Sequence, residues 1–238
     1  MRGLSHVREG TPGQDRTGYR SQRGVQALCL ADGAGSATHS DIGAQAVVDA
    51  GCSLLVENFE TFASEADGAG VKQHLLHTLR NKLEQVASRH DVEPGALACT
   101  FLCVAVSAEQ FIGAHIGDGV IGYQKDGALR VVSRPDNGEF ANRTTFVTSP
   151  DAASSMRLFR GQLTGISGFV LMSDGAGESL YNPRTGELAP ACAKLITSVG
   201  LASGHRKNSA HRKRLRRFTE VPLRNATRDD CAVAIFGR

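Results

Sequence analysis

The chain has 238 residues, of which 41% are apolar and 21% are charged, and its formal net charge is +3. These proportions are those of an ordinary globular protein and exclude a disordered or membrane-embedded chain. No apolar run approaches the ~18 to 20 residues that span a bilayer, and the first residues lack the apolar stretch of a signal peptide. We therefore expect one soluble, cytoplasmic domain over residues 1–238, with no membrane contact.

The positive charge is concentrated in one segment. Residues 205–217, HRKNSAHRKRLRR, hold seven of the 27 Lys and Arg residues and no acidic residue, so the remainder has 20 basic and 24 acidic groups, a balance of −4. Such a segment can bind nucleic acid or an acidic partner. Because no aromatic residues are interleaved for base stacking, the sequence favours a solvent-exposed helix face over a nucleic-acid site.

Short apolar runs bounded by Gly, Asp or Asn predict strands, and apolar residues at a spacing near 3.6 predict helices. In chain order, a strand at 25–31 is followed by helices at 41–62 and 71–90, the first with Ser40 as its N-cap. A late helix at 188–201 precedes a final strand at 231–236. The strands between them are predicted at 97–107, 110–116, 120–124, 129–133, 157–163 and 168–172.

The middle strands are expected to form an antiparallel meander, since Asp126-Gly127 supplies the positive φ angles of a tight hairpin turn. Strands grouped around helical pairs indicate an α+β fold, in which helices cover the outer faces of one or two antiparallel sheets. The polar stretch 133–156 is long and irregular for a connection inside a domain. It is either a functional flap or a tolerated surface insertion.

Four of the six cysteines, Cys29, Cys99, Cys103 and Cys231, lie inside apolar, strand-like runs. Cysteine in such runs behaves as a small apolar residue, so we expect buried thiols in a reducing compartment. Within CTFLC, Cys99 and Cys103 share one face of a strand, which indicates core packing and not redox or metal chemistry.

The tetrapeptide Asp-Gly-Ala-Gly occurs three times, beginning at Asp32, Asp67 and Asp174. Asp32 and Asp174 each follow an apolar run, so each carboxylate is expected at the end of a buried strand. There it can ligate a hard cation, while the following glycine lets the backbone approach the ion closely. Asp67 follows a polar stretch between two helices and is predicted to be a connecting turn.

Further acidic residues have similar placement. Asp118 lies at the junction of two predicted strands, Asp229 and Asp230 immediately precede the last strand, and Asp15 lies near the start. No set of Cys or His residues accompanies them. A set of ligands made only of oxygen atoms selects Mg²⁺, Mn²⁺ or Ca²⁺ over Zn²⁺.

Four strings in this order, ALCLADGAGS, IGAHIGDGVIGY, FVLMSDGAGESL and RDDCAVAIF, resemble the principal motifs of the type 2C protein phosphatase family of metal-dependent Ser/Thr phosphatases. The opening GLSHVREGTPGQD and the internal GEFANRTTF resemble stretches of a compact bacterial branch of that family. The resemblance spans nearly the whole chain.

The resemblance implies an α-β-β-α sandwich, with two central antiparallel sheets flanked by helical pairs and the active site at one rim. It also implies a centre of two Mn²⁺ or Mg²⁺ ions, with a third ion in bacterial members. Asp32 corresponds to the aspartate that bridges two ions, and Gly33 to the residue whose carbonyl binds one. The other residues that match family ligands or their neighbours are Asp15, Asp118, Asp174 and Asp229.

The activity implied by the resemblance is hydrolysis of phosphoserine and phosphothreonine in proteins. A hydroxide bridging the two metals would attack phosphorus in line with the departing Ser or Thr oxygen. Asp32, Asp174 and Asp229 are the implied catalytic carboxylates. We expect phosphorylated proteins and a cognate Ser/Thr kinase as partners, and a monomeric enzyme.

The chain departs from the family pattern in its first motif and after its first Asp-Gly. Gln14 stands where many members have Glu, so the second metal is expected to bind more weakly or through water. Gly10 stands at the spacing of a phosphate-contacting arginine, for which Arg8 or His6 is the candidate replacement. Ala34 stands where some members have a histidine proposed as the general acid.

Protonation of the leaving group is then assigned to water or to one of three histidines. His6 is included among the catalytic candidates for this reason, beside His39 and His115. His115 lies inside a predicted strand, where a histidine is more often a core residue than a catalytic one.

Two other functions compete with phosphatase activity. The chain could be a non-catalytic module of the same fold that binds a phosphorylated partner, but such a module does not need Asp32, Asp174 and Asp229 together. A nucleic-acid binder centred on residues 205–217 would show affinity that falls steeply with salt.

Overall fold

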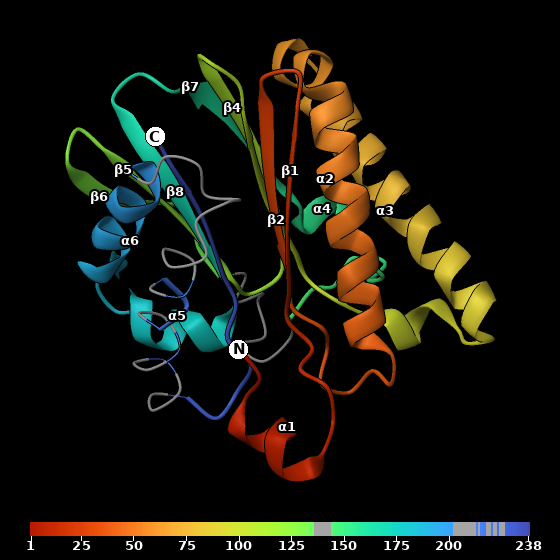
Figure 1. Ribbon diagram of the computed structural model, residues 1–238. Coiled ribbons are helices and arrows are strands. Elements are labelled where there is room, and N and C mark those ends of the chain that lie inside the picture. The colour runs from red at the N-terminus through yellow and green to blue at the C-terminus, as the bar shows by residue number, and fades with distance from the viewer. Residues whose placement is uncertain (136–143, 202–212, 214, 218–219, 221–222, 224–226) are drawn as a thin grey trace.

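Two antiparallel sheets lie face to face at the centre of the structure (Figure 1). The computed structural model describes residues 1–135, 144–201, 213, 215–217, 220, 223 and 227–238. In spatial order, the first sheet comprises β1 (Arg16–Gln22), β2 (Val25–Ala31), β3 (Phe101–Val106), β4 (Gln110–Ile116) and β7 (Arg157–Gln162). The second comprises β11 (Val233–Gly237), β8 (Ile166–Met172), β5 (Val120–Lys125) and β6 (Ala128–Ser133).

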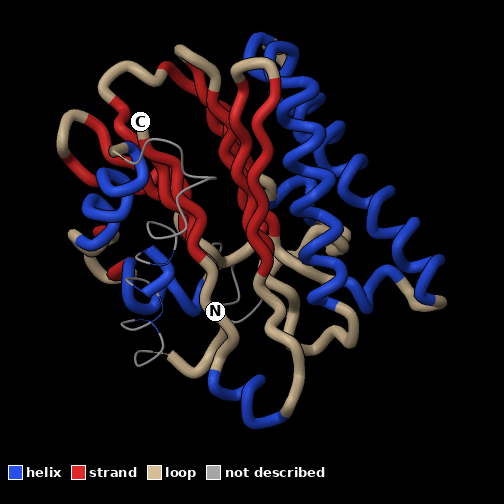
Figure 2. The backbone as a smooth tube through the Cα atoms, viewed as in Figure 1, coloured by secondary structure: helices blue, strands red, loops and turns tan. Residues whose placement is uncertain are grey.

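Helices cover the outer faces of both sheets, as the tube in Figure 2 shows. On the first sheet these are α2 (Ser40–Ser64) and α3 (Gly68–His90), and on the second α6 (Ala191–Gly200) packs against β8 and β11. The helix α5 (Asp174–Leu180) follows β8 directly. The predicted α+β fold, with its α-β-β-α layers, is therefore confirmed. Within the described residues, no helix combines the length and the apolar character needed to cross a membrane.

The remaining elements are short. The helix α1 (Leu4–Glu9) lies near the N-terminus, η1 (Pro94–Leu97) is a single 3₁₀ turn before β3, and α4 (Ala152–Ser155) precedes β7. The strands β9 (Tyr181–Asn182) and β10 (Glu187–Leu188) form a two-residue antiparallel pair between α5 and α6.

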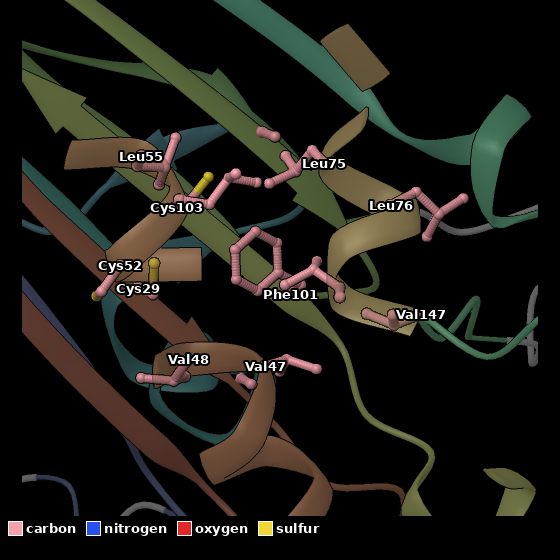
Figure 3. Close-up of a cluster of buried hydrophobic side chains, with 14 of the residues drawn as sticks. Cys29, Val47, Val48, Cys52, Leu55, Leu75, Leu76, Phe101, Cys103 and Val147 are labelled. Carbon is pink, nitrogen blue, oxygen red and sulfur yellow. The ribbon is translucent and has the colours of Figure 1, made fainter. Parts of the chain in front are cut away.

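The central strands are apolar at nearly every position because both of their faces are buried. In β3, Phe101 and Cys103 point to the layer beneath α2 and α3, whereas Leu102 and Val104 point to the layer between the sheets. This alternation follows from the two-residue period of a strand. Figure 3 shows Phe101 in the first layer, where a Cβ atom on Gly51 of α2 would lie only 2.5 Å from its ring.

The predicted helices 41–62 and 71–90 are confirmed as α2 and α3, but the predicted N-cap of the first is wrong. His39 occupies the cap position, and Ser40 is the first helical residue, with only 1% of its surface exposed. The late helix, expected from 188, begins at Ala191 because β10 uses Leu188. The strand β1 was not predicted, since its alternating polar residues belong to a largely exposed edge strand.

The predicted meander is wrong in its middle, because β4 and β5 do not pair. The chain leaves the first sheet after β4 and enters the second with β5, so Gly117, Asp118 and Gly119 form the crossing between sheets. The β5–β6 hairpin itself is confirmed, with φ angles of 50° at Asp126 and 79° at Gly127. The crossing places Asp118 at the same end of the sandwich as the end of β2.

All six cysteines are buried free thiols, as predicted for the four in apolar runs. Cys99 and Cys103 both belong to the core beneath α2 and α3. Of the polar stretch 133–156, residues 136–143 lie outside the described part of the chain, and so does most of the basic segment 205–217.

Candidate metal centre

Three aspartates that are far apart in sequence meet where β2 ends, β1 begins and α5 begins. The antiparallel pairing of Arg16 with Ala31 brings the flanking residues Asp15 and Asp32 opposite each other. The carboxyl of Asp32 lies within hydrogen-bonding reach of the carboxyls of both Asp15 and Asp174. The structure thus brings together the two Asp-Gly-Ala-Gly aspartates that follow apolar strands.

The electrostatics of this triad are unfavourable for three negative charges. Burial, together with the charges of Asp15 and Asp174, raises the pKa of Asp32 well above its usual value. Burial raises the pKa of Asp15 to about 6, even though hydrogen bonds with Asp32 and Ser173 act in the opposite direction. Burial also raises the pKa of Asp174. Each carboxylate therefore lacks compensating positive charge, which is the condition that a bound cation relieves.

Backbone and hydroxyl contacts hold the triad in place. Asp32 N donates to Thr100 Oγ1 at 2.9 Å, and Thr100 N donates to the Asp32 carbonyl at 2.8 Å. Ser173 Oγ donates to Asp15 Oδ2 at 2.7 Å and accepts from Ala232 N at 3.0 Å, so it ties β8, β11 and the start of β1 together. Neither Thr100 nor Ser173 was predicted, and only the position of Ser173 directly before Asp174 could have drawn attention to it.

Asp118 and Asp229 border the triad, and the charges of both contribute to the raised pKa of Asp174. Asp118 Oδ2 accepts from Thr144 Oγ1 at 2.6 Å, and Asp229 Oδ1 accepts from Asp230 N at 2.8 Å. Asp229 is the exposed member of the group. All five predicted aspartates therefore lie around one end of the sandwich.

Gly33, predicted to offer its carbonyl to a metal, forms an isolated antiparallel bridge with Cys99. A Cβ atom at this position would lie 2.8 Å from Cβ of Ser40, so the first residues of α2 pack directly on the backbone here. Glycine is required at this position by that close approach.

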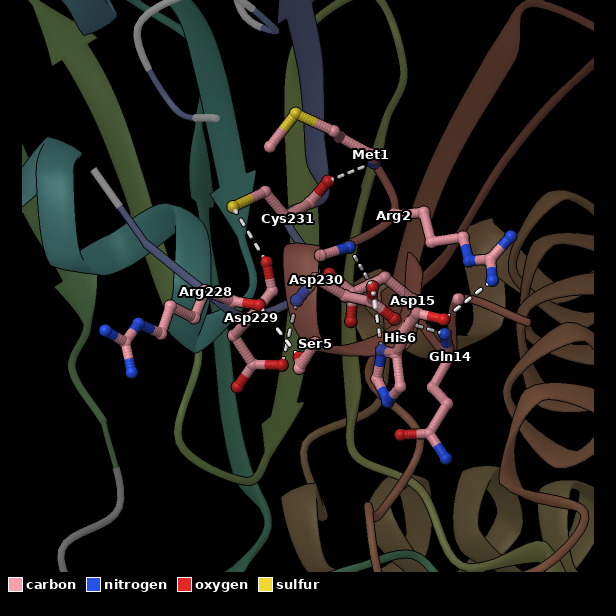
Figure 4. A network of polar contacts seen from close by, with 12 residues as sticks. Met1, Arg2, Ser5, His6, Gln14, Asp15, Arg228, Asp229, Asp230 and Cys231 are labelled. Atoms are coloured by element: carbon pink, nitrogen blue, oxygen red, sulfur yellow. Dashed lines mark hydrogen bonds and ion pairs between the residues drawn. The ribbon is translucent and has the colours of Figure 1, made fainter. Parts of the chain in front are cut away.

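Asp230 differs from its neighbours because it is fully supplied with donors (Figure 4). Its carboxylate accepts from Gly3 N at 2.6 Å and from Gln14 N, and Nδ1 of His6 lies 3.0 Å from its Oδ1. Burial acts to raise the pKa of Asp230, but these contacts outweigh it and the pKa is lowered. Asp230 thus joins α1 and the residues before Asp15 to the segment that immediately precedes β11.

Two of the residues that depart from the family pattern, Gly10 and Ala34, have structural explanations. Gly10 caps α1 in the left-handed conformation, with φ of 74°, which an arginine would adopt only with strain. Ala34 is buried, and its N–H donates to the Ala98 carbonyl at 2.9 Å. Gln14 contributes its backbone N–H to Asp230.

The three candidate histidines differ in access. His6 contacts Asp230, with 16% of its side chain exposed. His39 caps α2, and its Nδ1 lies 2.9 Å from Thr38 Oγ1. His115 is fully buried, with its Nδ1 2.8 Å from Ser133 Oγ and 3.0 Å from Arg157 Nη2, so it cannot meet a substrate. This places His115 in the core, as the strand pattern indicated.

The donor chemistry of the triad fits Mg²⁺ or Mn²⁺. Asp15 Oδ1 is buried and, within the described residues, has no hydrogen-bond partner. As the side chains stand, no set of three or more His, Cys, Asp or Glu side chains in the described part of the chain is arranged to enclose an ion. Ion binding therefore requires the carboxylates to turn toward a common point, which relief of their mutual repulsion favours.

Comparison with known proteins identifies the family. A sequence model of protein phosphatase 2C matches residues 2–218. The chain belongs to the protein phosphatase 2C family. A relative, serine/threonine-protein phosphatase 3 of Escherichia coli strain K12, is 26% identical over 162 residues, or 66% of this chain. The match spans 64% of the length of that relative.

Solved structures share the phosphatase 2C fold. A bacterial serine phosphatase superposes with a TM-score of 0.62 at 17% identity, covering 95% of this chain and 92% of that one. The serine/threonine phosphatase of S. agalactiae gives a TM-score of 0.62 at 14% identity, covering 95% and 94%. At this level of identity the likeness establishes the fold.

Proposed function

We propose that this phosphatase 2C homologue is a metal-dependent protein phosphatase that hydrolyses phosphoserine and phosphothreonine. The observation that supports the proposal is the triad of Asp15, Asp32 and Asp174, whose raised pKa values mark carboxylates without compensating charge. Perturbed groups of this kind gather at functional sites. The family, and the serine/threonine phosphatase activity in the name of the E. coli relative, support the same reaction.

The proposed ligands of two Mn²⁺ or Mg²⁺ ions are Asp15, Asp32 with the Gly33 carbonyl, Asp174 and Asp229, with Asp118 toward a third ion. When bound, such ions supply Lewis-acid activation of water and of the phosphoryl oxygens. Thr100 holds the backbone of Asp32, and Ser173 holds the carboxylate of Asp15. These contacts set where the carboxylates point.

We assign to His6 the proton that the departing Ser or Thr oxygen requires. Its Nδ1 lies 3.0 Å from Oδ1 of the buried Asp230, and Nε2 is the ring nitrogen proposed to donate the proton. A carboxylate at one ring nitrogen fixes the orientation of the imidazole. His39 and water are the alternatives, and replacement of His6 by Gln distinguishes them through the loss of the basic limb of the pH–rate profile.

The proposed substrates are phosphorylated proteins, and a cognate Ser/Thr kinase is the proposed partner. We propose that the protein acts on cytoplasmic phosphoproteins as a monomer. Both the location and the oligomeric state belong to the proposal.

The test is release of phosphate from a phosphothreonine peptide with Mn²⁺ or Mg²⁺ present, and with a chelator as the blank. Asp32→Asn and Asp174→Asn are each expected to reduce the rate on the order of 100-fold or more, since charge stabilisation by the metals contributes several kcal/mol. Asp67→Asn is the matched control because it carries the same change in the same tetrapeptide, at the start of α3.

An inactive wild type with either metal, or unchanged rates in the two variants, contradicts the proposal. A wild type that binds the phosphopeptide tightly and releases no phosphate would instead identify a binding module.

A further inference from the structure

The connection between β6 and β7 contacts the candidate metal centre on Asp118. From the described end of this connection, Thr144 Oγ1 donates to Asp118 Oδ2 at 2.6 Å. The hydrogen bond therefore restrains the carboxylate of Asp118 through one of its two oxygens. Asp118 itself lies in the crossing between β4 and β5, where no ladder hydrogen bonds hold the backbone.

A second contact reaches the same crossing from the first residue of β7. Arg157 Nη2 donates to the Gly117 carbonyl at 3.4 Å, immediately before Asp118. The same Nη2 lies 3.0 Å from His115 Nδ1, and Nη1 donates to the carbonyl of Arg134, the first residue after β6. One guanidinium therefore joins both ends of the β6–β7 connection to the crossing.

The surroundings of Arg157 are buried and closely packed. His115 is fully buried, and burial together with the charge of Arg157 lowers its pKa, so the neutral ring can accept a hydrogen bond from the guanidinium. Gly117 has a φ of 113°, and a Cβ atom there would lie 2.5 Å from Cγ2 of Thr100. Thr100 is also the residue that holds the backbone of Asp32, so the crossing and the triad share one support.

We propose that Thr144 and Arg157 are positioning residues that hold Asp118 toward the metal centre from two sides, the first through its carboxylate and the second through the Gly117 carbonyl. The inference rests on the proposed function, since it assigns a purpose to Asp118 at that centre. It makes Thr144 and Arg157 determinants of metal affinity.

The expected effect follows from how the partners of metal ligands behave. Loss of a group that orients a ligand typically weakens metal binding or activity by about 10-fold to 100-fold. Thr144→Val keeps the shape of the side chain and removes only the hydroxyl. Arg157→Gln removes the charge and the fork that spans the two carbonyls.

The experiment measures Mn²⁺ binding directly, from the electron paramagnetic resonance signal of free Mn²⁺ during titration, beside the Mn²⁺ dependence of phosphate release. Thr144→Val and Arg157→Gln are expected to raise the dissociation constant of the Mn²⁺ ion with the lowest affinity by about 10-fold. Thr144→Ser, which restores the hydroxyl, is expected to bind Mn²⁺ like the wild type. KM for the phosphopeptide at saturating Mn²⁺ is expected to stay unchanged.

Two matched controls separate positioning from general damage. Thr145→Val removes the neighbouring hydroxyl, which bonds Ser155 at 3.5 Å and not Asp118. Arg160→Gln removes another β7 arginine, whose guanidinium donates to the Glu65 carbonyl at the end of α2. Both are expected to bind Mn²⁺ with wild-type affinity, and thermal melting verifies that each variant is folded.

The outcomes decide the inference separately from the proposed function. Unchanged Mn²⁺ affinity in Thr144→Val and Arg157→Gln overturns the inference and leaves the proposed phosphatase function intact. A loss of Mn²⁺ affinity in Thr144→Ser equal to that in Thr144→Val also overturns the inference. A wild type that binds Mn²⁺ without releasing phosphate removes the proposed function, and the binding series still tests the positioning residues. A wild type that binds no Mn²⁺ overturns the inference, and the proposed function is then decided by phosphate release with Mg²⁺.

Discussion

Two neighbouring groups of carboxylates at one end of the sandwich have opposite electrostatics. Asp15, Asp32 and Asp174 contact one another with few donors, and their pKa values are raised. Asp230, with 3% of its surface exposed, is supplied by two backbone N–H groups and a histidine, and its pKa is lowered. The residue type is the same and the positions adjoin, so mutual repulsion and the supply of donors distinguish a site prepared for a cation from a structural anchor.

This comparison predicts that the two groups respond with opposite sign when a charge is removed. An anchor with all its donors stabilises the fold, whereas a repulsive triad stores unfavourable energy until a cation binds. Stability measurements on the metal-free protein test this directly.

The largest expected effect is that of Asp230→Ala, a destabilisation of about 3 kcal/mol, because Gly3 N and Gln14 N lose a buried, charged acceptor. The measurement is urea unfolding in chelator, followed by circular dichroism. Asp230→Asn keeps one acceptor oxygen and serves as the graded control, with a smaller loss. A loss well below 1 kcal/mol for the alanine variant would show that Asp230 does not anchor α1.

Asp32→Asn is expected to act in the opposite direction and to stabilise the metal-free protein by about 1 kcal/mol, since it removes a buried carboxyl whose ionisation is opposed by burial and by the charges of Asp15 and Asp174. The same urea titration measures it. With saturating Mn²⁺ the wild type should become more stable than Asp32→Asn, because Mn²⁺ binding adds to its free energy of unfolding and the variant has lost that binding. A destabilised metal-free Asp32→Asn protein contradicts the repulsive triad.

The pH dependence of stability should also separate the two regions. Asp15 has a pKa of about 6 when folded against a usual 3.8, so its contribution is fully present below 3.8 and is lost as pH rises through 6. The lowered pKa of Asp230 gives the reverse, a contribution present above 3.8 that is lost at more acidic pH. Because of the triad, the melting temperature in chelator should therefore fall as the pH rises from 4 to 7. The fall should be less steep in Asp15→Asn. A wild-type melting temperature that does not change with pH would contradict the assignment.

The smallest expected effect is that of Asp67→Asn, in the third Asp-Gly-Ala-Gly. Asp67 caps α3, and its carboxylate accepts from Ala69 N at 2.9 Å and Gly70 N at 3.1 Å. Asparagine caps a helix about as well as aspartate, so stability and phosphate release should both stay near wild type. Asp67→Ala should reduce stability by about 1 kcal/mol and leave the rate unchanged. A large loss of rate in either variant would show that the tetrapeptide itself carries function.

Much of the site could be predicted from local sequence because its aspartates end strong strands. The run before Asp32 becomes β2 over the predicted residues, and the run before Asp174 becomes β8. Continuous apolar runs are visible in the sequence because both faces of these strands are buried. The polar stretch before Asp67 separated the third copy from the two strand-end copies, as a connection between helices, and the structure shows in addition that Asp67 caps α3.

Other features had no local signal. The residues of β1 are polar on an edge strand, so the partner that brings Asp15 opposite Asp32 was not predicted. The sequence predicted one continuous meander where the chain in fact crosses from β4 in one sheet to β5 in the other. Consecutive strands show no local signal for which sheet each one joins. Ser173, Thr144 and Arg157 are ordinary residues in the sequence and acquire a role only through their neighbours in space.

The sequence by itself determined the α+β class, the main strands and helices, and which two Asp-Gly-Ala-Gly aspartates project from strand ends, since these depend on periodicity within a few residues. Only the tertiary structure decided which carboxylates repel one another and which are paired. Gly3 and Asp230 are 227 positions apart, yet they share a hydrogen bond of 2.6 Å. The pKa of a carboxyl group is set by burial and by the atoms within a few ångströms of it, and long-range packing alone brings those atoms together.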